Sequence, residues 1–310
     1  CVGFVCFLMV RRPARFTRVP YTTLSRSTAF SVEDGRVTVK AGRSRFTLST
    51  LPAAEFPTVE AGEGEIDLAL APTLVRQMID RTGFAMAQQD VRYYLNGMYM
   101  EIKEGRLRFV ATDGHRLALC TAPGQVEAED KSVIVPRKGI LELSRLLDAD
   151  GSVTLTVGSN HIRAATDQFT FTSKLIDGKF PEYERVLPRS PDKSVTGDRT
   201  ELRQAFTRTA ILSNEKYRGV RLALTNGSLE ITANNPEQEQ AEEMVPVDYS
   251  GEALEVGFNV SYLLDVLGVL SGSTVRMSLS DSASSALVED GDAGGETDAE
   301  ALYVVMPMRL

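Results

Sequence analysis

Two stretches of the chain, 71–90 and 198–216, alternate apolar and polar positions with the period of an α-helix. This pattern predicts amphipathic helices that each pack one face on a core. The expected buried faces consist of Leu74, Val75, Met78 and Ile79 in the first stretch and of Leu202, Ala205, Phe206 and Ala210 in the second. The expected exposed faces consist of Arg76, Gln77, Asp80 and Arg81 and of Arg203, Gln204, Thr207 and Arg208.

The two helices belong to a longer internal repeat. Their Arg-Gln pairs, and the arginine that follows each pair, lie 127 positions apart. Predicted strands at 105–113 and 227–235, helices at 137–151 and 259–273, and further strands then follow in the same order. A partial copy precedes them, because 35–57 matches 161–181 and both end on Phe-Pro. Repeats of this kind predict an α+β fold, in which helices cover one face of antiparallel sheets.

The charge pattern adds a possible role for the exposed helix faces. The formal net charge is −8, yet basic residues collect on the predicted helices, with Lys138 and Arg145 on the later one. Acidic residues gather at 234–243. Such faces could hold a polyanion through phosphate contacts that do not read sequence, although composition alone favours ordinary solvated helix faces. In the loop 88–98, Arg92 beside Tyr93 and Tyr94 suits phosphates and exposed bases, but a Tyr-Tyr pair is also common in cores.

The stretch ATDGHRLA, 111–118, carries the most reactive-looking cluster. A metal site at Asp113 and His115 would need further ligands, and the other histidine, His161, falls in a different predicted strand. Cys120 could act as a nucleophile beside His115, but a buried small residue explains it better. The segment 62–65, GEGE, lacks the Lys-Ser/Thr of a phosphate loop. We predict no catalytic residue, no metal and no cofactor.

The N-terminal segment is unusual. Ten apolar residues, CVGFVCFLMV, precede RRPARFTR, which reverses the order of a secretory signal. Ten residues are also too few to cross a bilayer. We expect residues 1 to about 30 to be a truncated or misassigned start, with a membrane anchor as the alternative. The three cysteines form no ligand or disulfide pattern, which favours a reduced, cytoplasmic protein.

Several longer motifs resemble one family. They are DVRYYLNGM (90–98), ATDGHRLA (111–118), VIVPRKG (133–139), FTSKL (171–175), FPEYERVLP (180–188), NEKYRGVRL (214–222), ITANNPEQE (231–239) and YVVMPMRL (303–310). They are similar to the bacterial sliding clamps, the beta subunits of DNA polymerase III, from about residue 33 to the end. That family forms head-to-tail homodimeric rings of three similar domains per subunit, with helices lining the hole. The resemblance implies a DNA-clamp fold, with a remnant of the first domain at 1–66 (1–32 not family-like), a middle domain at 67–185 and a C-terminal domain at 186–310.

The resemblance also implies three sets of functional residues. The DNA-binding set is Gln89, Arg92, Tyr93, Tyr94 and Lys138. The partner-peptide pocket is Leu95, Thr112, Gly114, His115, Arg116, Leu117, Pro181, Arg185, Val186, Asn259, Tyr262, Ser285, Val304, Met306, Pro307, Met308 and Arg309. The dimer interface is Phe46, Leu48, Ile211 and Leu212.

The implied function is that of a processivity factor that encircles double-stranded DNA. Its implied partners are the DNA polymerase III core, the clamp loader, and other polymerases and repair proteins that carry short peptide motifs. No membrane contact is expected. Because most of the first domain's opening half is absent or replaced, a monomeric derivative that only binds partner peptides is the alternative.

Overall fold

The computed structural model describes residues 28–55, 66–147, 151–188, 191–292 and 299–309, which belong to two compact units divided after residue 62. The N-terminal segment 1–27, with Cys1 and Cys6, and the GEGE stretch lie outside the described residues.

The first unit is an antiparallel sheet ordered β1-β2-β3. Its elements are β1 (Thr28–Glu33), β2 (Arg36–Ala41), β3 (Ser44–Ser49) and the 3-10 turn η1 (Ala53–Glu55). Val37 pairs with Leu48 and Val39 with Phe46. Phe46 and Leu48 are exposed, at 59% and 53%. Two of the residues expected at a dimer interface therefore present apolar side chains on one strand.

The second unit contains the predicted repeat twice, as a strand, a helix, four strands, a helix and three strands. The first repeat consists of β4 (Ile66–Leu70), α1 (Pro72–Thr82), β5 (Gly97–Lys103), β6 (Arg106–Thr112), β7 (Arg116–Thr121), β8 (Lys131–Pro136), α2 (Arg137–Leu146), β9 (Val153–Val157), β10 (His161–Ala165) and β11 (Thr170–Lys174). The second repeat consists of β12 (Lys193–Asp198), α3 (Arg199–Thr209), β13 (Gly219–Thr225), β14 (Ser228–Asn234), β15 (Gln240–Pro246), β16 (Leu254–Asn259), α4 (Val260–Val269), β17 (Thr274–Leu279), β18 (Ala286–Asp290) and β19 (Glu300–Val305). Short 3-10 turns are η2 (Gly83–Ala85), η3 (Tyr93–Leu95), η4 (Tyr183–Arg185) and η5 (Ala210–Leu212).

The two repeats share one sheet. Four-stranded sheets run β11-β10-β9-β4 and β15-β14-β13-β16, and an eight-stranded sheet runs β12-β17-β18-β19-β7-β6-β5-β8. Its middle junction pairs β19 of the second repeat with β7 of the first, with Val304 opposite Leu117 and Val305 opposite Arg116. A continuous ladder across this junction fixes the register between the two repeats, because each backbone group finds its partner in the other repeat.

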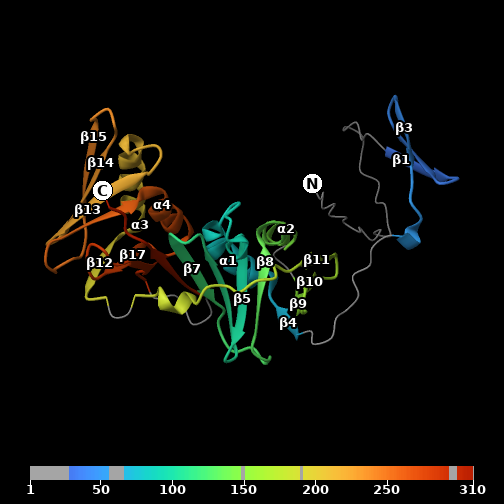
Figure 1. The fold of residues 1–310 in the computed structure, drawn as a ribbon, viewed down its shortest axis with the longest axis horizontal. Helices are drawn as coiled ribbons and strands as arrows, with labels where there is room; N and C mark the ends of the chain where they lie inside the picture. The colour runs from blue at the N-terminus through green and yellow to red at the C-terminus, as the bar shows by residue number, and fades with distance from the viewer. Residues whose placement is uncertain (1–27, 56–65, 148–150, 189–190, 293–298, 310) are drawn as a thin grey trace, which may run out of the picture. The chain divides into compact units, whose positions relative to one another are not determined.

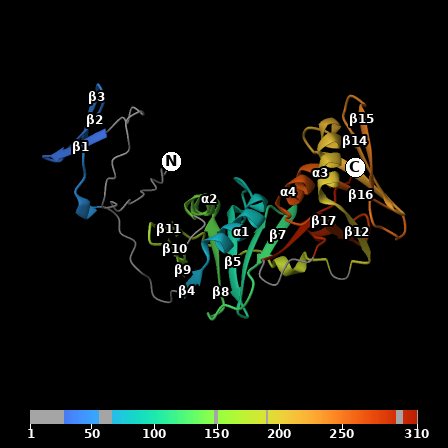
Figure 2. The same ribbon diagram turned by 180° about the vertical axis from the view of Figure 1, so that it is seen from behind.

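The four α-helices lie together on one side of the eight-stranded sheet, above it in Figure 1 and again in the opposite view of Figure 2. Helix α1 packs against β6 and β7, and α3 against β14 and β15. The expected core positions Val75, Met78 and Ile79 are buried, as are Leu202, Ala205 and Phe206. The Asp198 carboxylate accepts a bond from the Glu201 amide and so caps the start of α3. The predicted fold, repeated domains with helices on one face of antiparallel sheets, is confirmed.

The helix prediction is wrong in the helix ends and in one exposed position. Helices α2, α3 and α4 end at Leu146, Thr209 and Val269 rather than near residues 151, 216 and 273. Helix α1 ends at Thr82 rather than near residue 90, because the chain tightens into η2 at Gly83 and buries Ala85 and Met86. Arg81, expected on the exposed face, is 8% exposed. Its guanidinium donates to the Ala299 carbonyl and to Ser271 Oγ, both in the second repeat. The second repeat covers this end of α1, which the periodicity of α1 alone does not reveal.

Candidate functional site

The ATDGHRLA stretch forms the turn between β6 and β7, and most of its polar groups hold that turn. Asp113 Oδ1 accepts from the amides of His115 and Arg116 at 2.9 and 3.1 Å. Thr112 Oγ1 accepts from the Gly114 amide and donates to the Arg116 carbonyl. Gly114 has a φ of +90°, which disfavours residues with a β-carbon. The polar groups that suggested catalysis therefore make hydrogen bonds that stabilise the turn itself.

A cavity of about 180 Å³ lies beside this turn. Its walls come from four parts of the chain: the loop that contains η3, strands β6 and β7 with the turn between them, the connector between the repeats (which we define as residues 175–188), and β19 with the residue after it. Lining residues are Arg92, Leu95, Thr112, Gly114, Arg116, Leu117, Pro181, Glu182, Tyr183, Val186, Val304 and Met306. The cavity thus combines apolar side chains with a few polar ones, which is typical of sites for peptides and small molecules.

The structure brings together many residues of the expected peptide pocket but not all. Those that line the cavity are Leu95, Thr112, Gly114, Arg116, Leu117, Pro181, Val186, Val304 and Met306. Those that do not line it are His115, Arg185, Asn259, Tyr262, Ser285, Pro307, Met308 and Arg309.

The residues outside the cavity wall have other contacts. The His115 ring stacks on Tyr262 at a centroid distance of 6.4 Å. Asn259 caps α4 by accepting from the Ser261 amide. The Met308 amide donates to the Gly257 carbonyl, which ties the C-terminal segment to β16. Arg185 pairs with Glu182 on the connector.

Three lining residues fall outside the pocket expected from the sequence. Glu182 and Tyr183 follow Pro181 directly in the FPEYERVLP motif, so their position was a usable signal. Arg92, which was expected to face DNA, is exposed and also lines the cavity, and its guanidinium pairs with Asp90 at 2.9 Å and donates to the Asp113 carbonyl at 3.1 Å. No local pattern indicates the contact with Asp113, because it joins loops 21 positions apart.

Arg116 connects the two repeats at the rim of the cavity. Its side chain is 12% exposed and bonds to Asp113 at 3.1 Å, to the Phe84 carbonyl at 3.0 Å and to Asp265 of α4. Its guanidinium carbon lies 5.2 Å from the Phe84 ring centroid and 4.5 Å from that of Tyr262. Cation–π contacts of this kind, partly shielded from water, add to the attractions that hold the guanidinium in place.

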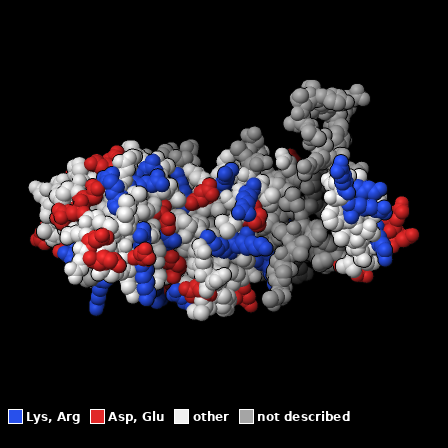
Figure 3. Space-filling view, turned by 90° about the horizontal axis from the view of Figure 1, so that it is seen from above, with Lys and Arg blue, Asp and Glu red and all other residues white. Residues whose placement is uncertain are grey.

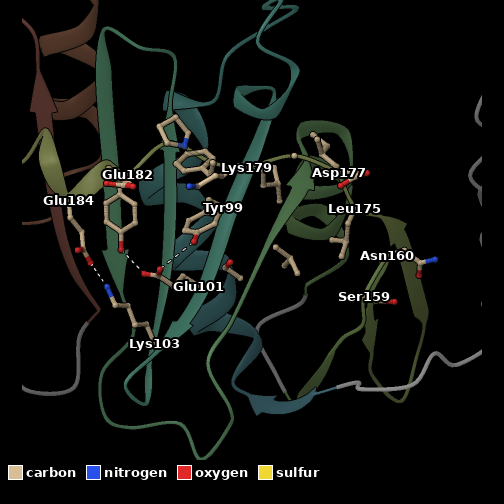
Figure 4. A pocket seen from close by; sticks show the side chains of 18 of the residues that line it. Tyr99, Glu101, Lys103, Ser159, Asn160, Leu175, Asp177, Lys179, Glu182 and Glu184 are labelled. Carbon is tan, nitrogen blue, oxygen red and sulfur yellow. Dashed lines mark hydrogen bonds and ion pairs between the residues drawn. The ribbon is translucent and has the colours of Figure 1, made fainter.

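A larger hollow, about 1160 Å³, lies under the connector beside β5 and β8. Figure 4 shows its side chains bonding to one another across that space. The Tyr183 hydroxyl donates to Glu101 Oε2 at 2.6 Å, and Lys103 donates to Glu184 at 2.8 Å. Phe180 stacks on Tyr99 at 4.7 Å. These contacts fasten the connector to the face of the sheet that carries Tyr99, Glu101 and Lys103. They therefore hold Pro181 and Val186 in the wall of the smaller cavity.

The residues expected to bind DNA lie on a loop and a helix. Gln89 is exposed with a φ of +57°, and Tyr93 is 57% exposed in η3. Tyr94 is half-buried and meets Tyr93 edge to face at 5.8 Å. Lys138 is exposed on α2. Of the expected dimer residues in the second unit, Ile211 is 76% exposed and Leu212 is half-buried in η5.

Basic residues on the helix side are accompanied by acids. Figure 3, which views the molecule from above, shows Lys and Arg side chains interspersed with Asp and Glu. Arg76 pairs with Asp80, Arg145 with Glu142, and Arg208 with Glu243. Lys138 and Arg203 are exposed and form no ion pair within the described residues. Among the exposed basic residues of the described α-helices, these two are the ones without an acidic partner.

The described part of the chain offers little for catalysis. No group of three or more His, Cys, Asp or Glu side chains within it could hold a metal ion. Cys120 is fully buried, and burial raises the pKa of its thiol to about 11, so it is protonated at neutral pH. None of the described helices has the length and apolar composition needed to cross a bilayer.

Comparisons with known proteins agree on one family. Residues 69–182 match the model of the DNA polymerase III beta subunit, central domain, and residues 184–309 match that of its C-terminal domain. The chain is 64% identical over 281 residues to the beta sliding clamp of Pseudomonas aeruginosa, covering 90% of this chain and 75% of that protein. It is 54% identical over 283 residues to the beta sliding clamp of Escherichia coli K12, covering 91% and 76%.

A crystal structure of the Pseudomonas aeruginosa sliding clamp bound to griselimycin superposes with a TM-score of 0.84. It is 63% identical in sequence, and the match covers 91% of this chain and 76% of that one.

Proposed function

The chain belongs to the DNA polymerase III beta subunit family, the beta sliding clamps, and we propose which of its residues carry out the clamp's work. A clamp raises the processivity of the replicative polymerase by tethering it to the duplex. In this chain the tether has two parts: a docking cavity for partner proteins and a basic helix side for DNA. Chemistry on the DNA belongs to the docked enzymes, and the chain itself is a non-catalytic, cytoplasmic accessory subunit.

The cavity beside the ATDGHRLA turn carries this proposal. Its apolar walls, with Leu117, Val186 and Met306, suit the anchoring side chains of a short peptide, while Thr112 and Arg116 border it with polar groups. Both repeats and the connector contribute, so the cavity exists only when all three are in place. We propose that it binds short peptide segments of the polymerase III core, the clamp loader, and other polymerases and repair proteins.

The griselimycin complex of the Pseudomonas aeruginosa clamp supplies a probe for this cavity. We propose that griselimycin binds here in competition with partner peptides. Changing Val186, which is 38% exposed, to Lys would place a charge in the apolar wall without disturbing a buried core. We expect griselimycin affinity to fall by roughly thirtyfold, the effect of losing an interface anchor worth about 2 kcal/mol.

Isothermal titration of wild type and Val186→Lys tests this proposal, with Val91→Lys as the matched control. Val91 is 95% exposed and does not line the cavity, so its variant should bind as the wild type does. Circular dichroism checks that each variant folds. Equal affinity in Val186→Lys and wild type would place griselimycin elsewhere and remove the main support for peptide docking at this cavity.

The DNA part of the proposal rests on charge and exposure. Gln89, Arg92, Tyr93 and Tyr94 are exposed or half-buried on the loop, Lys138 is exposed on α2, and Arg203 is exposed on α3. Contacts from such residues to phosphates would let the duplex slide, because the backbone is uniform along its length.

We further propose that two copies form a head-to-tail homodimer around the duplex, with Phe46 and Leu48 of one copy against Ile211 and Leu212 of the other. These side chains are exposed or half-buried in the described residues. Sedimentation equilibrium of the 310-residue chain tests this, and Ile211→Lys should shift the mass to that of a monomer. A monomeric wild type would instead favour a derivative that only binds partner peptides.

A further inference from the structure

Arg116 has few ways to bind a docked peptide, although it borders the cavity. Three acceptors use the edge of its guanidinium: Asp113, the Phe84 carbonyl and Asp265. The rings of Phe84 and Tyr262 lie over its plane. Because 12% of the side chain is exposed, few of the guanidinium N–H groups can reach another partner. Its contacts point to a role within the protein.

These contacts join elements from both repeats. Asp113 belongs to the β6–β7 turn and Phe84 to η2, both in the first repeat, whereas Tyr262 and Asp265 lie on α4 in the second. The cavity wall is divided in the same way, because Thr112 and Leu117 come from the first repeat, and Val304 and Met306 come from β19 and the residue after it. Close by, the Met306 amide donates to the His115 carbonyl at 2.9 Å. The β7–β19 ladder sets the spacing of Leu117 and Val304, and the contact with α4 holds the β6–β7 turn beside them.

We propose that Arg116 is a positioning residue for partner docking, and that its ion pair with Asp265 holds the β6–β7 turn, which carries Thr112 and Gly114, in place at the cavity rim. The inference rests on the proposed docking function. It identifies Asp265, which does not line the cavity and whose side chain is 47% exposed, as a determinant of peptide affinity. The sequence motif contains Arg116 but gives no indication of Asp265, which lies 149 positions away.

Titration of griselimycin into full-length wild type, Asp265→Asn, Asp265→Glu, Arg116→Gln and the Arg116→Gln/Asp265→Asn double variant tests this proposal. We expect Asp265→Asn to weaken binding by roughly five- to thirtyfold, which lies within the roughly two- to 150-fold range of coupling between contacting residues. Asp265→Glu keeps the charge and should recover most of the affinity. The double variant should bind no more weakly than Arg116→Gln, because both changes break the same pair.

The matched control is Glu255→Gln, which breaks the exposed Arg221–Glu255 pair on the sheet of the second repeat. It should leave griselimycin affinity unchanged. If wild type binds griselimycin and Asp265→Asn binds equally well, the positioning role is overturned while the docking function stands. The same holds if Asp265→Asn lowers the melting temperature but not the affinity. If wild type itself does not bind, the docking function is what fails.

Discussion

The Arg92 guanidinium lies directly over Gly114, so that a β-carbon at Gly114 would come within 2.9 Å of both terminal nitrogens. The same guanidinium pairs with Asp90 and donates to the Asp113 carbonyl. Arg92 therefore joins the loop that carries Gln89, Tyr93 and Tyr94 to the turn that borders the docking cavity. The φ of +90° at Gly114 favours glycine, and a β-carbon there would also push the end of the Arg92 side chain aside.

Gly114→Ala should weaken griselimycin binding and lower stability. The new methyl group displaces Arg92 from the cavity wall, and the backbone conformation becomes strained by about 1–3 kcal/mol. Gly124→Ala is the matched control, because Gly124 has a φ of +77° and nothing within 4 Å of its would-be β-carbon. Urea denaturation should show a loss in both variants, but a loss of griselimycin affinity only in Gly114→Ala. Equal affinity in the two variants would contradict a role for the Arg92–Gly114 contact in docking.

Asp90 should titrate well below an ordinary aspartate. The side-chain hydrogen bond from Arg92, helped by the Arg92 backbone amide, lowers the pKa of Asp90 to about 2 from 3.8. A depressed carboxyl pKa contributes stability that is fully present above pH 4 and is lost as the pH falls towards 2. Carbon-detected NMR of the Asp90 carboxyl group measures this directly. In Arg92→Gln the pKa should rise towards 3.8 without reaching it, because the backbone amide bond remains. An unchanged pKa in that variant would rule out the assigned cause.

Duplex binding should be independent of sequence and should weaken steeply as salt increases, because phosphate contacts release counterions. Lys138→Ala and Arg203→Ala should each reduce affinity and lower the salt slope by about 1. Arg221→Ala is the control, since Arg221 is exposed but pairs with Glu255 on a strand. Fluorescence anisotropy with duplexes of unrelated sequence measures both quantities. A salt-independent or sequence-selective affinity would contradict the proposed DNA contact.

The sequence predicted the repeat, the order of helices and strands along it and most of each helix face, because these depend on patterns that recur along the chain. It did not predict the burial of Arg81. The pattern of α1 places this residue on the exposed face, but the second repeat covers it. The motif at 111–118 gave the position of the docking turn. It could not give Asp265 or Phe84 as partners of Arg116, since these contacts form only after the β7–β19 junction brings distant segments together.

Tyr183 fastens the connector to the sheet, and removing its hydroxyl should measure that attachment. The hydroxyl donates to Glu101 Oε2 at 2.6 Å, and burial raises the pKa of Tyr183 above its ordinary value, so it remains a donor throughout the neutral range. Tyr183→Phe keeps the ring against Tyr99 but withdraws one donor from a carboxylate that is 12% exposed. A hydrogen bond to a charged group contributes about 1.5–3 kcal/mol, and we expect a loss in the lower part of that range, because Tyr99 and Arg108 still donate to Glu101.

Urea denaturation of Tyr183→Phe measures this loss, with Tyr217→Phe as the control. Tyr217 is 56% exposed, so its hydroxyl is accessible to water and its removal should cost little. Griselimycin affinity should also fall slightly in Tyr183→Phe, because a looser connector holds Pro181 and Val186 less firmly in the cavity wall. A stability change no larger than that of Tyr217→Phe would mean that Phe180 and Lys103, rather than Tyr183, hold the connector on the sheet.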